Sequence, residues 1–266
     1  MTGVNDAPAL KKADVGFSMG SGTEIAKEAS DIVILDNNFS SISKAICYGR
    51  TIFKSIRKYI IFQLSTCICA VATTVIGSFI GVDSPITIIQ MLWINIVMDT
   101  LAGLAFSGEK ARLKYMKEPP KLRNEPIINK YMTRQIAINS IYTTLICLVF
   151  LKNPKLQNIF YSHGEAYMMT GFFTLFMFSA IFRSFCVRTH EINIFEYISA
   201  NKPFIWIMGI IGLIQIVIVY FGGTVFRTVG LNINHIVLIG LIAFTIVPIS
   251  TAIKYMFSRM GELKGT

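Results

Sequence analysis

Six long apolar stretches constrain the fold of this chain more than any other feature. A helix needs about 20 predominantly apolar residues to cross a bilayer. The composition agrees, because 53% of the 266 residues are hydrophobic, 15% are charged and the mean hydropathy is +0.57. An ordinary soluble domain of this length is less apolar. We therefore predict a mainly α, polytopic helical membrane bundle with six spans, at about 59–82, 88–106, 134–151, 166–186, 204–222 and 235–257.

Lys and Arg residues outnumber acidic residues by 25 to 15, which gives a net charge of +10, and they lie at the flanks of the spans. They gather in alternate connections, whereas the opposite connections hold only Lys152, Lys155 and Arg227. Under the positive-inside rule, both termini then face the cytoplasm. The expected partner of this charge is a lipid bilayer and not nucleic acid. The basic residues on the cytoplasmic side are Lys110, Arg112, Lys114, Lys117, Lys121, Arg123, Lys130, Arg134, Arg183, Arg188, Lys202, Lys254, Arg259 and Lys264. Of these, Arg183 lies near a span end and is expected to extend to the membrane interface.

Residues 1–50 are polar and differ from the rest of the chain. The pattern predicts strands at 13–19 and 31–35, with a helix at 23–29 opened by a capping box of Ser21 and Glu24. Two strands cannot form a complete sheet, so this region is interpreted as the C-terminal remnant of a larger α/β domain. A helix starting near Ser40 is predicted to continue into the first span. The expected domains are 1–50 and 51–266.

One acidic residue, Asp99, lies in the middle of the second apolar stretch. A charge at the bilayer centre costs about 2.5–3.5 kcal/mol, so such residues usually have a function. Asn95 lies four positions earlier, on the same face of a helix. Together they offer oxygen ligands to a hard cation, and Gly103 could let the helix unwind and expose carbonyl groups. The structural alternative is an Asn–Asp pair that hydrogen-bonds a neighbouring helix.

The remaining polar residues of the spans predict packing and not chemistry. Those of the first span are expected at helix–helix contacts, and Asn139 and Gln215 in interhelical hydrogen bonds. The three histidines show no ligand spacing. The five cysteines show no C-x-x-C pattern and are interpreted as reduced, small apolar residues. The polar residues of the first span are Gln63, Ser65, Thr66, Thr73 and Thr74. In the same span, Gly77 and Gly81 form a weak close-packing motif.

The most specific string in the chain is Gly3-Val4-Asn5-Asp6-Ala7-Pro8. Asn5 and Asp6 follow a glycine turn, as suits a phosphate or Mg²⁺ site at the edge of an α/β sheet. Taken alone, such a string also caps many ordinary turns.

Together these strings resemble the C-terminal part of a P-type ATPase of the plasma-membrane calcium-pump branch. GVNDAPALKKADVGFSMG is similar to the hinge motif of that family, and SGTEIAKEASDIVILDNNFSSI to the segment leading into its fifth transmembrane helix. QMLWINIVMDTLAGLAF is similar to its sixth helix, and the last four spans are compatible with helices seven to ten. The resemblance covers essentially the whole chain.

The resemblance implies a protein that transfers a phosphoryl group from ATP to an aspartate and thereby moves calcium across the plasma membrane. Such chemistry uses Mg²⁺. Asn5 and Asp6 would then belong to the hinge near the phosphorylated aspartate. Asn95 and Asp99 would be calcium ligands, although manganese accepts the same oxygens.

Three departures from the family pattern limit what the chain can do alone. The hinge of the family reads Thr-Gly-Asp-Gly-x-Asn-Asp, whereas here Met1-Thr2-Gly3 runs straight into Val4, so the Mg²⁺-binding aspartate is missing. No Asp-Lys-Thr-Gly-Thr occurs, so the phosphorylated aspartate, the nucleotide and actuator domains and helices one to four are missing. Cys67 falls where calcium pumps commonly carry Asn, and Ala70 falls where those with two calcium sites carry Glu, so the resemblance implies at most one calcium site.

We therefore expect a truncated reading frame that neither hydrolyses ATP nor pumps without the N-terminal half of the pump. ATP and Mg²⁺ are expected to bind in the complete pump and not well to this chain. The rival hypothesis is a non-catalytic six-span membrane protein, such as a channel, an assembly partner or a pseudogene remnant.

Overall fold

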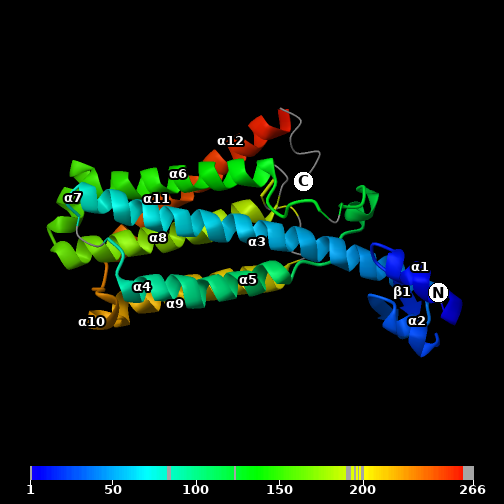
Figure 1. Cartoon of the computed structure of the whole chain (residues 1–266). Helices are drawn as coiled ribbons and strands as arrows, with labels where there is room; N and C mark the ends of the chain where they lie inside the picture. Colours follow the sequence, from blue (N-terminus) through cyan, green and yellow to red (C-terminus); the bar gives the residue numbers. More distant parts are fainter. Residues whose placement is uncertain are drawn as a thin grey trace. The chain divides into compact units, whose positions relative to one another are not determined.

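The computed structural model describes residues 2–82, 85–122, 124–189, 193–194, 196, 198 and 201–259. The chain divides into two compact units, Met1–Lys54 with Lys110–Ile127, and Ser55–Glu109 with Ile128–Thr266 (Figure 1). Helix α3 (Phe39–Phe79) has 41 residues and contributes to both units. The uninterrupted helix that the sequence predicts from Ser40 is therefore confirmed. The histidine at 190 and the basic residues Arg123 and Lys264 lie outside the described residues.

The first unit contains a two-stranded parallel sheet. Strands β1 (Phe17–Met19) and β2 (Ile32–Ile34) pair with Phe17 opposite Ile32 and Met19 opposite Ile34. Both strands are shorter than predicted. Next to them, the Gly16 N–H donates to the Asp31 carboxylate at 2.7 Å, and the Gly16 carbonyl accepts the backbone N–H groups of Asp31 at 3.0 Å and Ile32 at 3.1 Å. The 3₁₀ turn η1 (Val4–Asp6), α1 (Ala7–Lys12) and α2 (Glu24–Glu28) complete the segment.

The residue that caps α2 differs from the prediction. Thr23 is the N-cap, and its hydroxyl accepts the Ala26 N–H at 3.3 Å. Ser21 instead donates its backbone N–H to Asn37 Oδ1 at 2.8 Å. The prediction of a Ser21–Glu24 capping box is therefore wrong by two residues, because Ser21 is used in the turn between β1 and the helix.

In the same unit, basic side chains of α3 hold the segment that contains the 3₁₀ turn η3 (Leu113–Lys117). Arg50 Nη1 donates to the carbonyl oxygens of Tyr115 at 2.7 Å and Glu118 at 2.6 Å. Lys54 Nζ lies 2.6 Å from a Glu118 carboxylate oxygen and 4.5 Å from the centre of the Tyr115 ring. A charged donor to a carbonyl makes a strong hydrogen bond, so this loop is fixed by its backbone.

The second unit is a bundle of helices laid lengthwise against one another (Figure 1). Among the described residues, six helical stretches are long and apolar enough to cross a membrane, as the sequence predicts: Phe39–Phe79, Ile88–Ser107, Lys130–Lys152, Glu165–Arg188, Lys202–Phe221 and Ile233–Arg259. The chain is therefore an integral membrane protein. The elements are α4 (Ile88–Leu92), the π-helix η2 (Trp93–Met98), α5 (Asp99–Ser107), α6 (Lys130–Lys152), α7 (Pro154–Tyr161), α8 (Glu165–Arg188), α9 (Lys202–Phe221), α10 (Gly223–Phe226), α11 (Ile233–Phe244) and α12 (Ile246–Arg259).

Helix α8 is the centre of this bundle. It packs against α6, α7, α9, α11 and α12, and 78% of its most apolar window is buried, the largest share among the six spans. Gly171 permits the close approach, because a Cβ atom there would lie 2.9 Å from the Phe160 ring. Phe150 and Phe160 pack edge to face, with ring centres 5.1 Å apart.

Two spans end or bend where local chemistry requires it. Helix α3 ends at Phe79 and not at the predicted residue 82, because Gly81 takes a positive φ of 78° and the Val82 N–H returns to the Gly77 carbonyl at 2.9 Å. The last span is interrupted at Thr245, between α11 and α12. Pro248 explains the break, because it has no N–H to donate and its ring collides with the carbonyl four residues earlier.

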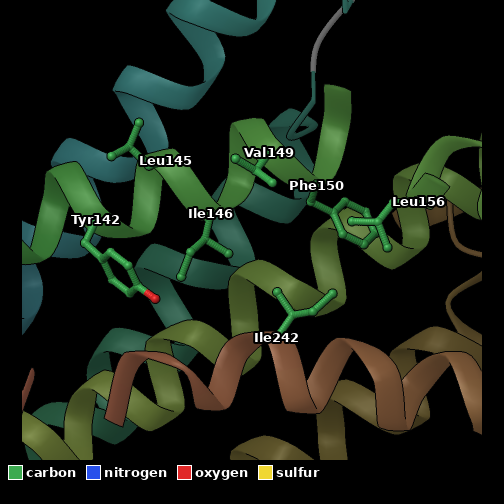
Figure 2. A pocket seen from close by; sticks show the side chains of 7 residues that line it. All are labelled: Tyr142, Leu145, Ile146, Val149, Phe150, Leu156 and Ile242. Atoms are coloured by element: carbon green, nitrogen blue, oxygen red, sulfur yellow. The ribbon is translucent and has the colours of Figure 1, made fainter. Parts of the chain in front are cut away.

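A cavity of about 280 Å³ opens between α6, α7 and α11 (Figure 2). The phenol of Tyr142 is its single polar lining group, and it donates to the Thr245 hydroxyl at 2.9 Å. No carboxylate lines the cavity, so it has no ligand for a cation. The lining residues are Tyr142, Leu145, Ile146, Val149, Phe150, Leu156 and Ile242.

Candidate ion-binding site

Asp99 begins α5 directly after a π-helical segment, η2. Its backbone N–H donates to the carbonyl of Ile94, five residues earlier and not four. The Thr100 hydroxyl donates to the carbonyl of Ile96, a residue of η2, and so adds a side-chain hydrogen bond to this turn. π-helical turns inside α-helices are rare and occur often at functional sites. The backbone irregularity therefore immediately precedes the acidic residue.

Gly103 is not the point where the helix departs from α geometry. It lies inside α5, and a Cβ atom there would be 3.5 Å from the Tyr59 ring. The prediction that Gly103 unwinds the helix is wrong, because the glycine brings α5 close to α3 and the irregular turn comes before Asp99.

Asp99 is buried in the bundle, with 2% of its surface exposed. One carboxylate oxygen, Oδ2, accepts a hydrogen bond from Nε2 of Gln63 on α3 at 2.5 Å. Gln63 Nε2 also lies 3.7 Å from the Cys67 sulfur, one turn along the same helix. The acid is thus bound to a neighbouring helix, as the structural alternative requires.

Two side-chain oxygens of the Asp99–Gln63 pair accept no hydrogen bond among the described residues. Oδ1 of Asp99 and Oε1 of Gln63 are buried and accept no hydrogen bond from any residue that the structure describes. A buried carboxylate oxygen without a partner is costly. Carboxylate and amide oxygens are the ligands that Ca²⁺ uses, although it takes six to eight of them. The described residues contain no group of three or more His, Cys, Asp or Glu side chains, so a cation here would rely on this carboxylate with neutral oxygens.

Asn95 is placed differently from Asp99. It lies in η2 and is exposed, whereas Asp99 is buried. Among the described residues no hydrogen bond joins the two side chains, and Asp99 is bonded to Gln63 instead. The structure therefore brings Asp99 together with Gln63 and not with Asn95. Whether Asn95 and Asp99 bind an ion stays a prediction.

Gln63 is the site residue that sequence reasoning missed. It is a neutral residue among several on the first span, and nothing in its spacing relates it to Asp99, 36 positions later. The signal that could have found it is chemical. A lone carboxylate in an apolar stretch needs a donor from another span, and Gln63 is the one primary amide in the first span.

Three further predictions about polar residues are wrong. Arg183 does not reach the interface, because its side chain is 0% exposed in the bundle. Asn139 donates to Gln135 of its own helix at 3.5 Å, and therefore not between helices. Gln215 is fully buried, and neither its amide oxygen nor its nitrogen has a hydrogen-bond partner among the described residues.

The hinge residues lie in the first unit. Asp6 Oδ2 accepts the backbone N–H groups of Thr2 at 2.9 Å and Gly3 at 3.0 Å and so closes the turn η1. These bonds, first from Gly3 and then from Thr2, lower the pKa of Asp6 below its ordinary value. Asn5 is exposed on the same turn. Asp6 is therefore a turn-forming carboxylate, and Asn5 is accessible to a ligand.

A six-span bundle with a buried carboxylate beside a π-helical turn defines an integral membrane protein with a polar site inside its apolar bundle. Residues 83–256 match the family model described as the C-terminus of cation transporting ATPases. The chain therefore belongs to the P-type cation-transporting ATPase family and corresponds to its C-terminal membrane part. Residues 3–46 match the family model described as haloacid dehalogenase-like hydrolase.

The curated relatives of the chain include several calcium-transporting ATPases. Calcium-transporting ATPase 2 of Schizosaccharomyces pombe is 43% identical over 231 residues, which cover 84% of this chain and 18% of the relative. The plasma membrane-type calcium-transporting ATPase 9 of Arabidopsis thaliana is 39% identical over 236 residues, 86% of this chain and 22% of the relative. Plasma membrane calcium-transporting ATPase 2 of Oreochromis mossambicus is 39% identical over 247 residues, which cover 87% of this chain and 22% of the relative. The chain thus spans about a fifth of the length of these relatives.

Proposed function

We propose that this chain supplies the calcium-binding membrane helices of an ATP-driven pump, with Asp99 as its charged ligand. One observation carries the proposal: Asp99 is buried and keeps one carboxylate oxygen without a hydrogen-bond partner among the described residues. Gln63 Oε1 is a second oxygen of this kind and adds a neutral ligand. The names of the relatives support calcium as the transported ion.

Asn95 is proposed as a further oxygen ligand. Its exposed position in η2 leaves its amide accessible to an ion or to another part of the pump. The i→i+5 bonding of η2 supports a role for this turn in the site, since π-helical turns are often functional. Ca²⁺ needs more oxygens than Asp99 and Gln63 hold, so the remaining ligands belong to other helices.

The topology and partners of the proposed pump follow from charge and from the relatives. The Lys and Arg residues favour an orientation with both termini in the cytoplasm. The relatives that are named plasma-membrane enzymes support that membrane as the location. The proposed partners are the bilayer and the portion of a pump that carries the phosphorylated aspartate, the nucleotide domain and the actuator domain. Asn5 and Asp6 would lie at the hinge that joins this chain to ATP and Mg²⁺ chemistry.

The experiment that tests the proposal is calcium transport by a chimera, in which this chain replaces the corresponding segment of the Schizosaccharomyces pombe relative. ATP-driven uptake of radioactive calcium into vesicles is expected for the chimera. Asp99→Asn keeps the shape and the acceptor for Gln63 but removes the charge, and it should abolish uptake. Asn95→Ala should raise the calcium concentration at half-maximal uptake several-fold.

A control for Asn95→Ala is Asn139→Ala, which also truncates an asparagine, here a buried one on α6 that donates to Gln135 of its own helix. It should transport calcium with unchanged affinity. Uptake that survives Asp99→Asn would refute the ligand assignment. Uptake of manganese in place of calcium would change the ion but keep the site, and a chimera that inserts into vesicles without transporting either ion would favour a non-catalytic membrane protein.

A further inference from the structure

Arg183 is a buried cation that its own bundle leaves without a hydrogen bond. It lies on α8 with 0% of its surface exposed. Its three guanidinium nitrogens, Nε, Nη1 and Nη2, have no hydrogen-bond partner among the described residues. An isolated charge inside a membrane bundle is expensive, and such residues commonly mark an ion pathway or a counter-ion.

Arg188, five residues further along α8, shows that a buried arginine on this helix can donate to backbone carbonyl groups. Its Nη2 donates to the carbonyl oxygens of Ile194 at 2.9 Å and Glu196 at 2.7 Å, and its guanidinium lies 5.8 Å from the Phe204 ring centre. The same helix therefore carries one arginine that is bonded to carbonyl groups and one that is not. The lack of such bonds at Arg183 is a property of that position.

Asp99 is the carboxylate whose charge interacts with that of Arg183. The charges of the two residues interact in the second unit, where the thiols of Cys67, Cys69, Cys147 and Cys186 also lie near Arg183. Both charges are buried, with Asp99 2% and Arg183 0% exposed. No ion pair within 4 Å joins them among the described residues. The interaction is therefore through space, where screening by water is weak.

Helices α5 and α8, which carry Asp99 and Arg183, both pack against α9 through aromatic rings. The Phe204 ring on α9 lies 5.5 Å from Phe106 of α5 and 5.1 Å from Phe185 of α8, both edge to face. These helices thus share α9 as a neighbour, as their packing in the bundle also shows. The medium around Asp99 and Arg183 is apolar and closely packed, so their charges act over a longer range than they would in water.

We propose that Arg183 is the internal counter-charge of the Asp99 cation site. The positive guanidinium offsets the carboxylate when no ion is bound, and it repels a divalent cation that binds there. Arg183 is then a positioning residue that weakens calcium binding and disfavours a second cation. This inference rests on the proposed function, since it presumes that Asp99 binds the ion.

The first test measures calcium affinity. The chimera described above, which carries the complete set of pump helices, and its variants are placed in lipid nanodiscs and titrated with Ca²⁺ by calorimetry. Arg183→Gln removes the charge and should tighten calcium binding roughly tenfold, as expected for the loss of a nearby positive charge in a poorly screened medium. Arg183→Lys keeps the charge and should bind within about threefold of the unsubstituted chimera. Unchanged affinity in Arg183→Gln would overturn the proposal.

Arg188→Gln is the matched control, because it removes a buried arginine from the same helix that donates to the carbonyl groups of Ile194 and Glu196. It should lower stability without changing calcium affinity. Equal tightening in Arg188→Gln and Arg183→Gln would show a general effect of net charge and would also overturn the proposal.

The second test does not depend on calcium. Thermal unfolding in a calcium chelator is measured for Asp99→Asn, Arg183→Gln and the double variant. Each single variant leaves one buried charge without its counter-charge, so the double variant should be more stable than the sum of the two changes predicts. Strict additivity would overturn the counter-charge. Coupling without any effect of Asp99→Asn on calcium binding would keep the counter-charge but reject the proposed ion site.

Discussion

Lys58 of α3 and Glu109, which follows α5, form an ion pair that is almost completely buried. Lys58 Nζ lies 2.5 Å from Glu109 Oε2, and the two side chains are 1% and 4% exposed. Ser55, one turn before Lys58, places its hydroxyl 3.5 Å from the same oxygen. The pair joins the two helices that also supply Gln63 and Asp99.

Removing one partner of this pair should destabilise the chain strongly. Lys58→Met or Glu109→Gln breaks this buried ion pair by removing one of its two charges and should cost about 3–5 kcal/mol. The double variant with Lys58→Met and Glu109→Leu should lose much less stability, because it removes both charges of the pair together. Thermal unfolding in nanodiscs, followed by circular dichroism, measures the difference. The exposed pair Lys27–Glu24 is the control, and Lys27→Met should cost below about 1 kcal/mol.

Gln63→Leu should weaken both the bundle and the proposed ion site. It removes the donor to Asp99 Oδ2 and a buried acceptor, and we expect a loss of about 1–2 kcal/mol in stability with weaker calcium binding. Thr66→Val is the control on the same helix, because the Thr66 hydroxyl bonds only to the Phe62 carbonyl of its own turn. If both variants unfold at the same temperature and bind calcium equally, Gln63 has no special relation to Asp99.

Arg50→Gln should release the loop that contains η3. The variant loses charged donors to the Tyr115 and Glu118 carbonyls, so local opening becomes easier. Trypsin should then cleave after Lys114 or Lys117 several-fold faster, as mass spectrometry of the fragments would show. Lys44→Gln, at an exposed position of the same helix, should leave the cleavage rate unchanged. Equal rates for the two variants would contradict the role of Arg50.

The turn η1 should persist at acidic pH. Because the backbone bonds lower the pKa of Asp6 in the folded chain, its contribution is present above the unfolded pKa of about 3.9 and is lost as the pH falls through the lower folded value. Carbon-detected NMR of the Asp6 carboxyl group should give a midpoint below about 3.9. Asp6→Ala should speed hydrogen exchange at Thr2 and Gly3, whereas Asp14→Ala should not. A midpoint at or above 3.9 would contradict the bonds seen in η1.

The apolar spans and the family could be predicted from the sequence because they depend on local composition and on contiguous strings. A run such as 88–106 is apolar enough to insert whatever it packs against. The positions of helix ends depended on single residues, and Gly81 and Pro248 shifted or broke two of them. The same holds for the short N-terminal segment, where Thr23 and not Ser21 caps the helix.

The sequence by itself determined that the chain contains six membrane-crossing helices, a hinge-like turn and one carboxylate in an apolar stretch. Only the tertiary structure decided that Asp99 bonds to Gln63, that Asn95 is exposed and that Arg183 is buried. The reason is that a helical pattern specifies which residues share a face within one span but not which spans face each other. The neighbours of a buried charge come from packing between helices that are distant in sequence, and no local pattern encodes them.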